Sequence, residues 1–83
     1  MKVNITRRAE KDLINLDPEL RIRIYKALYK LRDGEVTFKK LKGLENTRRL
    51  RVGDYRIVFE VDEIKKVIYI RYIKHRKEVY RDI

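Results

Sequence analysis

The sequence predicts an α+β fold in which two N-terminal antiparallel helices pack on an antiparallel β-sheet of about four strands. Two observations support this fold class. Apolar residues recur with helical spacing as far as residue 33, and from residue 48 onward the chain has the pattern of strands. A chain of 83 residues forms one domain, residues 1–83, with a single modest core. We therefore expect the function to lie on the surface.

A short strand and a helix are expected first. Residues 2–5 form an extended segment that adds a strand to the sheet. Thr6 is a suitable N-cap, because its hydroxyl accepts a hydrogen bond from the first turn of a helix. Ala9, Leu13 and Leu16 then recur at helical spacing and predict a short amphipathic helix.

The second helix has clear start and stop signals. Asp17 is an N-cap, and Pro18 occupies the first helical position, where a missing N–H costs nothing. The pattern ends at Asp33-Gly34. Five apolar residues lie along one face of this helix: Leu20, Ile24, Ala27, Leu28 and Leu31. A tight turn between the two helices makes them an antiparallel pair.

The second half of the chain predicts a sheet. Two extended runs, residues 48–52 and 55–61, are separated by Gly53-Asp54, which suits a two-residue hairpin loop with glycine in its first central position. A third run over 67–74 is rich in Ile and Tyr. Residues 75–83 are expected to close the chain with a turn or a short helix.

The composition narrows the chemistry. The chain has 23 Lys and Arg against 13 Asp and Glu, a net charge of +10, and the half after residue 35 holds +7 of it. It lacks Cys and Ser, and His75 is its one histidine, so disulfides, serine triads and histidine or cysteine metal sites are excluded. We expect no cofactor and no metal. No apolar run approaches about 20 residues, so we expect no membrane partner and a cytoplasmic location.

The hairpin register gathers arginines. A loop at Gly53-Asp54 pairs Arg51 with Arg56 and places Arg49 on the same face of the sheet. The helix-packed side takes Leu50, Val52, Tyr55, Ile57 and Phe59. Like charges directly opposite each other are destabilising unless an anion binds between them. An anion site and an ordinary solvated charged face both remain open at this point.

The C-terminal segment adds further cationic and aromatic groups near Arg56. They are His75, Arg76, Lys77, Tyr80 and Arg81. Arginine binds phosphate in a bidentate manner and a tyrosine ring stacks on an unpaired base, so the set is typical of a single-stranded RNA site. The lysines of residues 39–42 fit either a solvated loop or a phosphate clamp.

Three stretches, residues 40–44, 49–59 and 75–80, together resemble the RelE/ParE superfamily of toxins from toxin–antitoxin systems, with the RelE branch the closer match. The resemblance implies a compact, microbial-ribonuclease-like fold. It implies ribosome-dependent, metal-independent cleavage of mRNA in the A site, and neutralisation by an acidic RelB-like antitoxin. Two alternatives stay open: a ParE-like DNA gyrase inhibitor that acts by binding, and a non-catalytic family member that only binds RNA or an antitoxin.

The resemblance also implies roles for individual residues. Arg49 and Arg51 occupy positions where RelE toxins often carry lysines, and Arg56 matches the arginine that binds the scissile phosphate. Arg76 matches the C-terminal arginine of the site, a place that His75 could share. Tyr80 matches the tyrosine that contacts the base beside the cleavage point. Further RNA-binding residues are expected at Lys40, Lys42, Arg71, Lys77 and Arg81.

The expected site is short of proton carriers. Arginine keeps its proton, because its pKa stays above ~12. The arginines therefore suit stabilisation of a charged transition state, and His75 and Tyr80 are the residues left to move protons.

Overall fold

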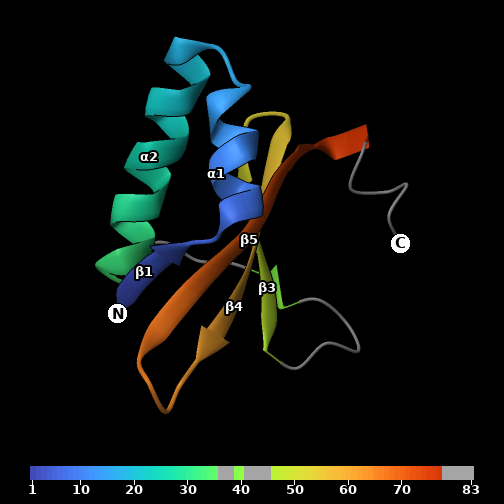
Figure 1. The fold of residues 1–83 in the computed structure, drawn as a ribbon. Helices are drawn as coiled ribbons and strands as arrows, with labels where there is room; N and C mark the ends of the chain where they lie inside the picture. Colours follow the sequence, from blue (N-terminus) through green and yellow to red (C-terminus); the bar gives the residue numbers. More distant parts are fainter. Residues whose placement is uncertain (36–38, 41–45, 78–83) are drawn as a thin grey trace.

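The computed structural model describes residues 1–35, 39–40 and 46–77, with the backbone alone described for 39–40. Within these residues the chain forms two helices and a five-stranded sheet (Figure 1). The elements in chain order are β1 (Lys2–Ile5), α1 (Arg7–Ile14), α2 (Pro18–Arg32), β2 (Lys39–Lys40), β3 (Thr47–Val52), β4 (Tyr55–Asp62) and β5 (Val67–His75). Neither of the helices described is long and apolar enough to cross a membrane.

The α+β class and the helix pair are confirmed, but the sheet is mixed. Its strand order is β1-β5-β4-β3-β2, and the first of these pairings, β1 with β5, is parallel. The prediction of a wholly antiparallel sheet is therefore wrong. The physical reason is that the first strand pairs with the last, and the helices, which lie between them in the chain, provide the crossover that a parallel pair requires.

Both predicted N-caps are present. The Thr6 hydroxyl accepts a hydrogen bond from the N–H of Ala9 at 3.4 Å, and an Asp17 carboxylate oxygen accepts one from the N–H of Leu20 at 3.0 Å. Pro18 stands at the start of α2, as expected. These side chains satisfy amide donors that the first turn of a helix leaves without partners.

Arg21 joins the two helices. From α2 its guanidinium donates to the carbonyl oxygens of Leu13, Ile14 and Leu16 at 2.9–3.0 Å. These carbonyls lie at the end of α1 and in the turn after it, where a helix has no internal donors left. One side chain thus caps α1 and fixes the angle of the helical hairpin.

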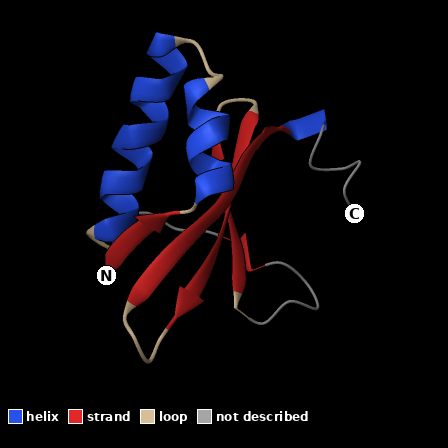
Figure 2. Ribbon diagram, in the orientation of Figure 1, coloured by secondary structure: helices blue, strands red, loops and turns tan. Residues whose placement is uncertain are grey.

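The helices cover one face of the sheet, and the core lies between the two layers (Figure 2). The predicted inward residues of the hairpin are in place, since Leu50, Ile57 and Phe59 are buried and Tyr55 packs against them. Gly53 has φ +59, as its predicted loop position requires. The opposite face, which we call the outer face, carries the candidate site.

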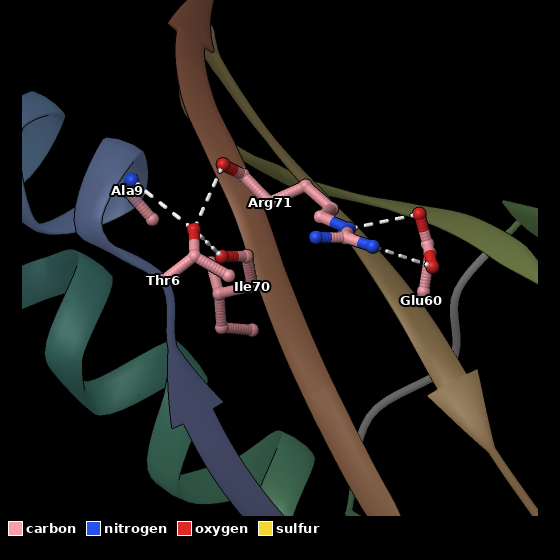
Figure 3. Close-up of polar contacts among 5 residues, drawn as sticks. All are labelled: Thr6, Ala9, Glu60, Ile70 and Arg71. Carbon is pink, nitrogen blue, oxygen red and sulfur yellow. Dashed lines mark hydrogen bonds and ion pairs between the residues drawn. The ribbon is translucent and has the colours of Figure 1, made fainter.

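A β-bulge in β5 sets which side chains reach each face. Val58 pairs with Tyr72 whereas the next residue, Phe59, pairs with Ile70, so Arg71 is an extra residue in β5. The Thr6 hydroxyl lies 2.6 Å from the carbonyl oxygen of Ile70 and 3.1 Å from that of Arg71 (Figure 3). The hydroxyl that caps α1 thus also donates its proton at the bulge, where the carbonyl oxygen of Ile70 is the nearer acceptor.

The end of the chain is described as far as residue 77. Arg76 and Lys77 follow β5 with helical backbone. The rest of the expected C-terminal turn or short helix lies outside the described residues.

Replacement of Thr6 by valine, which keeps the shape and removes the hydroxyl, should lower the free energy of unfolding by about 2 kcal/mol, because it removes both a cap and a donor to the bulge. Thr6→Ser keeps the hydroxyl and should cost less than half as much. Urea denaturation measures both. Equal losses for the two variants would contradict a role for the hydroxyl.

Candidate nucleic-acid interface

The predicted arginine register is present. Arg51 pairs with Arg56 across β3 and β4, and Arg49 pairs with Val58. Cross-strand partners point to the same face of a sheet, and along each strand the arginines alternate with the residues that face the helices. The three arginines therefore share the outer face of the sheet, as the two-residue loop predicts.

The row of cations extends to a third strand. Arg56 pairs with Lys74 of β5, so Arg51, Arg56 and Lys74 form one row across β3, β4 and β5. Two strand spacings make this row roughly 10 Å long at the backbone. We call it the cationic row. Such a row suits the negatively charged backbone of a polyanion.

The sequence analysis did not include Lys74 among the site residues. Strict alternation along 67–74 would put Lys74 on the same face as Ile68 and Ile70, which is the core side. The available signal is the spacing of isoleucines, because Ile68 and Ile70 are two residues apart and Ile73 follows three residues later. All three are buried, and the bulge at Arg71 accounts for the change of step.

Arg56 is the fixed member of the row. Its exposed fraction is 8%, and among the residues described it is the one charged side chain that is buried. Its Nη1 donates to the carbonyl oxygen of Tyr55 at 3.2 Å. Burial and hydrogen bonding hold the guanidinium in one orientation, so it presents a preorganised positive charge at the centre of the outer face.

Arg51 and Arg76 both contact the hairpin turn. Arg51 Nε donates to the carbonyl oxygen of Gly53 at 3.1 Å, and the backbone N–H of Arg76 donates to the carbonyl oxygen of Asp54 at 2.7 Å. The predicted C-terminal arginine therefore lies beside the turn, two residues beyond Lys74. Its side chain is exposed.

His75 lies on the other side of the sheet. It pairs with Tyr55, which packs against the core, and the two rings meet edge to face with centroids 5.4 Å apart. Its Nδ1 accepts a hydrogen bond from the N–H of Lys77 at 3.3 Å. The structure thus does not bring His75 to the face that Arg56 occupies, because the bulge sets the alternation of β5 in this sense.

Arg71 is engaged by a carboxylate. Its Nε and Nη2 donate to the two oxygens of Glu60 at 2.8 and 3.1 Å, a bidentate ion pair (Figure 3). These hydrogen bonds raise the pKa of the Arg71 guanidinium above its usual value. Arg71 is on the outer face but its charge is neutralised by Glu60, whereas Arg49 and Arg51 form no ion pair with any described residue.

The remaining predicted RNA-binding residues are only partly placed. Lys77 is exposed after β5. Lys40 pairs with Arg48 through β2, with its backbone alone described. Lys42, Tyr80 and Arg81 lie outside the described residues.

Two helices on one face of a mixed sheet, with arginines on the other, define a small α+β domain with a cationic sheet face. The family model for the ParE toxin of the type II toxin–antitoxin system parDE matches residues 3–80. The chain is also 36% identical to Toxin RelE3 of Methanocaldococcus jannaschii, over 96% of each chain. It belongs to the RelE/ParE superfamily of toxins.

Solved structures agree with this assignment. The RelB–RelE antitoxin–toxin complex from Methanococcus jannaschii matches with a TM-score of 0.79 at 30% identity, over 95% of this chain and 96% of the other. The archaeal RelE–RelB complex from Pyrococcus horikoshii matches with a TM-score of 0.77 at 29% identity, over 90% and 93%. The similarity thus spans almost the whole length of each chain compared.

The contrast between Arg51 and Arg71 predicts a difference in RNA binding. Arg51→Gln should weaken binding of a single-stranded RNA about three- to ten-fold and reduce the slope of log K against log salt by about 1, because one phosphate contact is lost. Arg71→Gln should leave the slope unchanged, since Glu60 already neutralises that charge. Fluorescence anisotropy at several salt concentrations measures both. Equal slopes for the two variants would contradict the view that Arg51 contacts a phosphate and Arg71 does not.

Proposed function

We propose that this protein is a ribosome-dependent, metal-independent endoribonuclease that cleaves mRNA in the A site and so inhibits translation. The observation that carries the proposal is the cationic row with the buried Arg56 at its centre. The similarity to RelE toxins supports it independently.

The proposed reaction is an internal transfer of the phosphodiester. The 2′-oxygen of one nucleotide attacks the adjacent phosphorus, the bond from phosphorus to the 5′-oxygen breaks, and the products are a 2′,3′-cyclic phosphate and a 5′-hydroxyl. Negative charge builds up on the phosphoryl oxygens in the transition state. Arg56 offers a guanidinium held in place by burial to this charge, and such a preorganised donor stabilises it without rearrangement. Arg51, which is exposed, adds a second guanidinium.

The reaction also needs a proton for the leaving 5′-oxygen. An ammonium group can give up a proton far more readily than a guanidinium, and Lys74 pairs directly with Arg56. We assign this step to Lys74. Tyr80 remains the proposed contact for the base and the proposed acceptor for the 2′-hydroxyl proton, with Arg49 and Arg76 supporting the charge. Of the two proton carriers expected from the sequence, Tyr80 keeps its proposed role, whereas His75 lies on the helix-packed side of the sheet, away from Arg56.

An acidic antitoxin is the proposed partner. Two of the relatives of known structure, from Methanococcus jannaschii and Pyrococcus horikoshii, are complexes of RelE with RelB. On this chain α2 exposes Ile22, Tyr25 and Tyr29, and a groove between α2 and β1 is lined by Tyr25, Val3 and Arg32. Apolar side chains beside positive charge suit an amphipathic acidic helix laid in a groove. A neighbouring reading frame whose product does not bind this protein would contradict the proposal.

A gyrase inhibitor is the second candidate, favoured by the match to the ParE family model. It requires binding and no proton transfer. A supercoiling assay separates the two: gyrase poisoning with intact translation supports the second candidate, and A-site cleavage with unaffected gyrase supports the first.

Arg56→Ala should reduce mRNA cleavage on programmed ribosomes by a factor on the order of 100 or more, because the central charge on the scissile phosphate is lost. Mapping of mRNA 5′ ends measures this. Arg56→Lys, which preserves the charge in a buried position, tests whether loss of folding explains the defect, and Arg71→Gln is the matched control outside the cationic row. Absence of A-site cleavage by the wild-type protein would refute the enzymatic proposal.

Lys74→Arg should slow cleavage by about 100-fold while leaving RNA affinity unchanged, since it keeps the charge and removes the proton donor. A substrate with sulfur in place of the leaving 5′-oxygen needs no proton on departure. With this substrate the variant should recover nearly the wild-type rate in single-turnover cleavage. A defect of the same size on both substrates would show that Lys74 does not supply the proton.

A further inference from the structure

Arg8 lies over an aromatic ring on the outer face, outside the cationic row. Its Cζ is 4.7 Å from the centroid of the Tyr72 ring, and the Nζ of Lys74 is 5.2 Å from the same centroid. Both distances are within the range of cation–π attraction. Arg8 belongs to α1 and Tyr72 to β5, so this cluster joins the helical layer to the sheet.

The position of α1 explains how Arg8 reaches this face. The parallel pairing of β1 with β5 ends at Ile70, and beyond it α1 lies along the edge of β5. A carboxylate oxygen of Asp12 accepts a hydrogen bond from the backbone N–H of Ile73 at 2.9 Å. Asp12 is one turn after Arg8 on the same side of α1, so the same docking that satisfies this edge amide directs Arg8 toward Tyr72.

Tyr72 belongs to a second row parallel to the cationic row. Arg49, Val58 and Tyr72 face one another across β3, β4 and β5. Val58 is 2% exposed although it lies outside the core cluster, so side chains on the outer face cover it. This second row thus runs beside the cationic row, and Arg8 lies at its Tyr72 end.

The Tyr72 ring beside the cationic row fits the two halves of a nucleotide. Bases stack on aromatic rings and on guanidinium planes, whereas phosphates bind cations. We propose that Tyr72 and Arg8 form a subsite for a nucleotide beside the scissile phosphate, distinct from the nucleotide whose base Tyr80 contacts. Its base lies against Tyr72 and Arg8, and its phosphate lies on Arg8 and Lys74. The subsite rests on the proposed function, because it takes its place in the RNA from the phosphate at Arg56.

A single-stranded RNA fits this cluster better than an acidic peptide does. Both carry negative charge, but the half-buried Tyr72 ring adds a flat surface that a carboxylate does not use. Base stacking on an aromatic side chain is a substantial contribution to binding, worth about ten-fold or more per base. The base should therefore contribute to affinity separately from the charge.

Binding is tested on the intact protein without ribosomes. The probe is a fluorescein-labelled 2′-O-methyl hexaribonucleotide, which has no free 2′-hydroxyl within the chain and so is not cleaved, and a second probe carries the same phosphates with abasic sugars. The variants are Arg8→Gln and Tyr72→Leu, which keeps an apolar cover over Val58. Arg7→Gln is the matched control, because Arg7 is the neighbouring exposed cation of α1 and points about 100° away.

We expect Arg8→Gln to weaken binding of the base-bearing probe by about five-fold or more and Arg7→Gln by less than two-fold. Tyr72→Leu should reduce affinity about ten-fold for the base-bearing probe and little for the abasic one. Equal effects of Arg8→Gln and Arg7→Gln, or equal effects of Tyr72→Leu on both probes, would overturn the subsite. Poly-L-glutamate serves as the acidic-peptide probe. If both subsite variants weaken its binding as much as they weaken RNA binding, the subsite is not specific for RNA and the proposal is overturned.

The outcome is separable from that of the proposed function. If wild type lacks A-site cleavage but the probes behave as expected, the subsite stands and the reaction falls. If A-site cleavage depends on Arg56 but the probes do not distinguish Arg8 from Arg7, the reaction stands and the subsite is wrong.

Discussion

The extra residue at Arg71 is the constraint on which both faces of the sheet depend. Side chains alternate along a strand, and one inserted residue reverses the alternation for everything that follows. Because of it Ile73 enters the core after Ile68 and Ile70, and Lys74 reaches the outer face opposite Arg56. Without the bulge, Ile73 would face solvent and Lys74 would face the core. The apolar core and the cationic row thus require the same irregularity.

Interactions from distant parts of the chain meet at the bulge. The Thr6 hydroxyl, at the start of α1, lies within hydrogen-bonding distance of the carbonyl oxygens of Ile70 and Arg71. Glu60 of β4 holds the Arg71 side chain, and Asp12 of α1 accepts from the amide just beyond. Each contact satisfies a group that an irregular ladder leaves unpaired or charged. The helices therefore contribute to the site by fixing the register of β5, as well as by covering the core.

Local signals were sufficient to predict the helices and the first hairpin. Thr6 and Asp17 cap amides three residues away, and Gly53-Asp54 determines the pairing of Arg51 with Arg56. Each of these interactions spans only a few residues, so a short stretch of sequence is enough to predict it. The parallel pairing of β1 with β5 joins residues more than sixty positions apart in the chain. The pairing of Lys74 with Arg56 depends on the one inserted residue in β5. Composition and periodicity do not encode the pairing of distant strands, whereas the uneven spacing of the isoleucines in β5 is a local sign of the inserted residue. The sequence therefore predicted Arg49, Arg51 and Arg56 correctly as a shared face, and it missed Lys74.

The difference between arginine and lysine gives the proposed site its division of labour. A guanidinium keeps its proton at any physiological pH and binds phosphate through several fixed donors, so the buried Arg56 suits the role of a permanent charge. An ammonium is a more mobile point charge whose proton can be transferred. In the proposed reaction Arg49 and Arg51 keep their protons, so another residue has to transfer one. On the described outer face the lysine paired with Arg56 is Lys74. The proposed reaction therefore depends on the bulge, because the bulge brings Lys74 opposite Arg56, the proposed phosphate-binding residue.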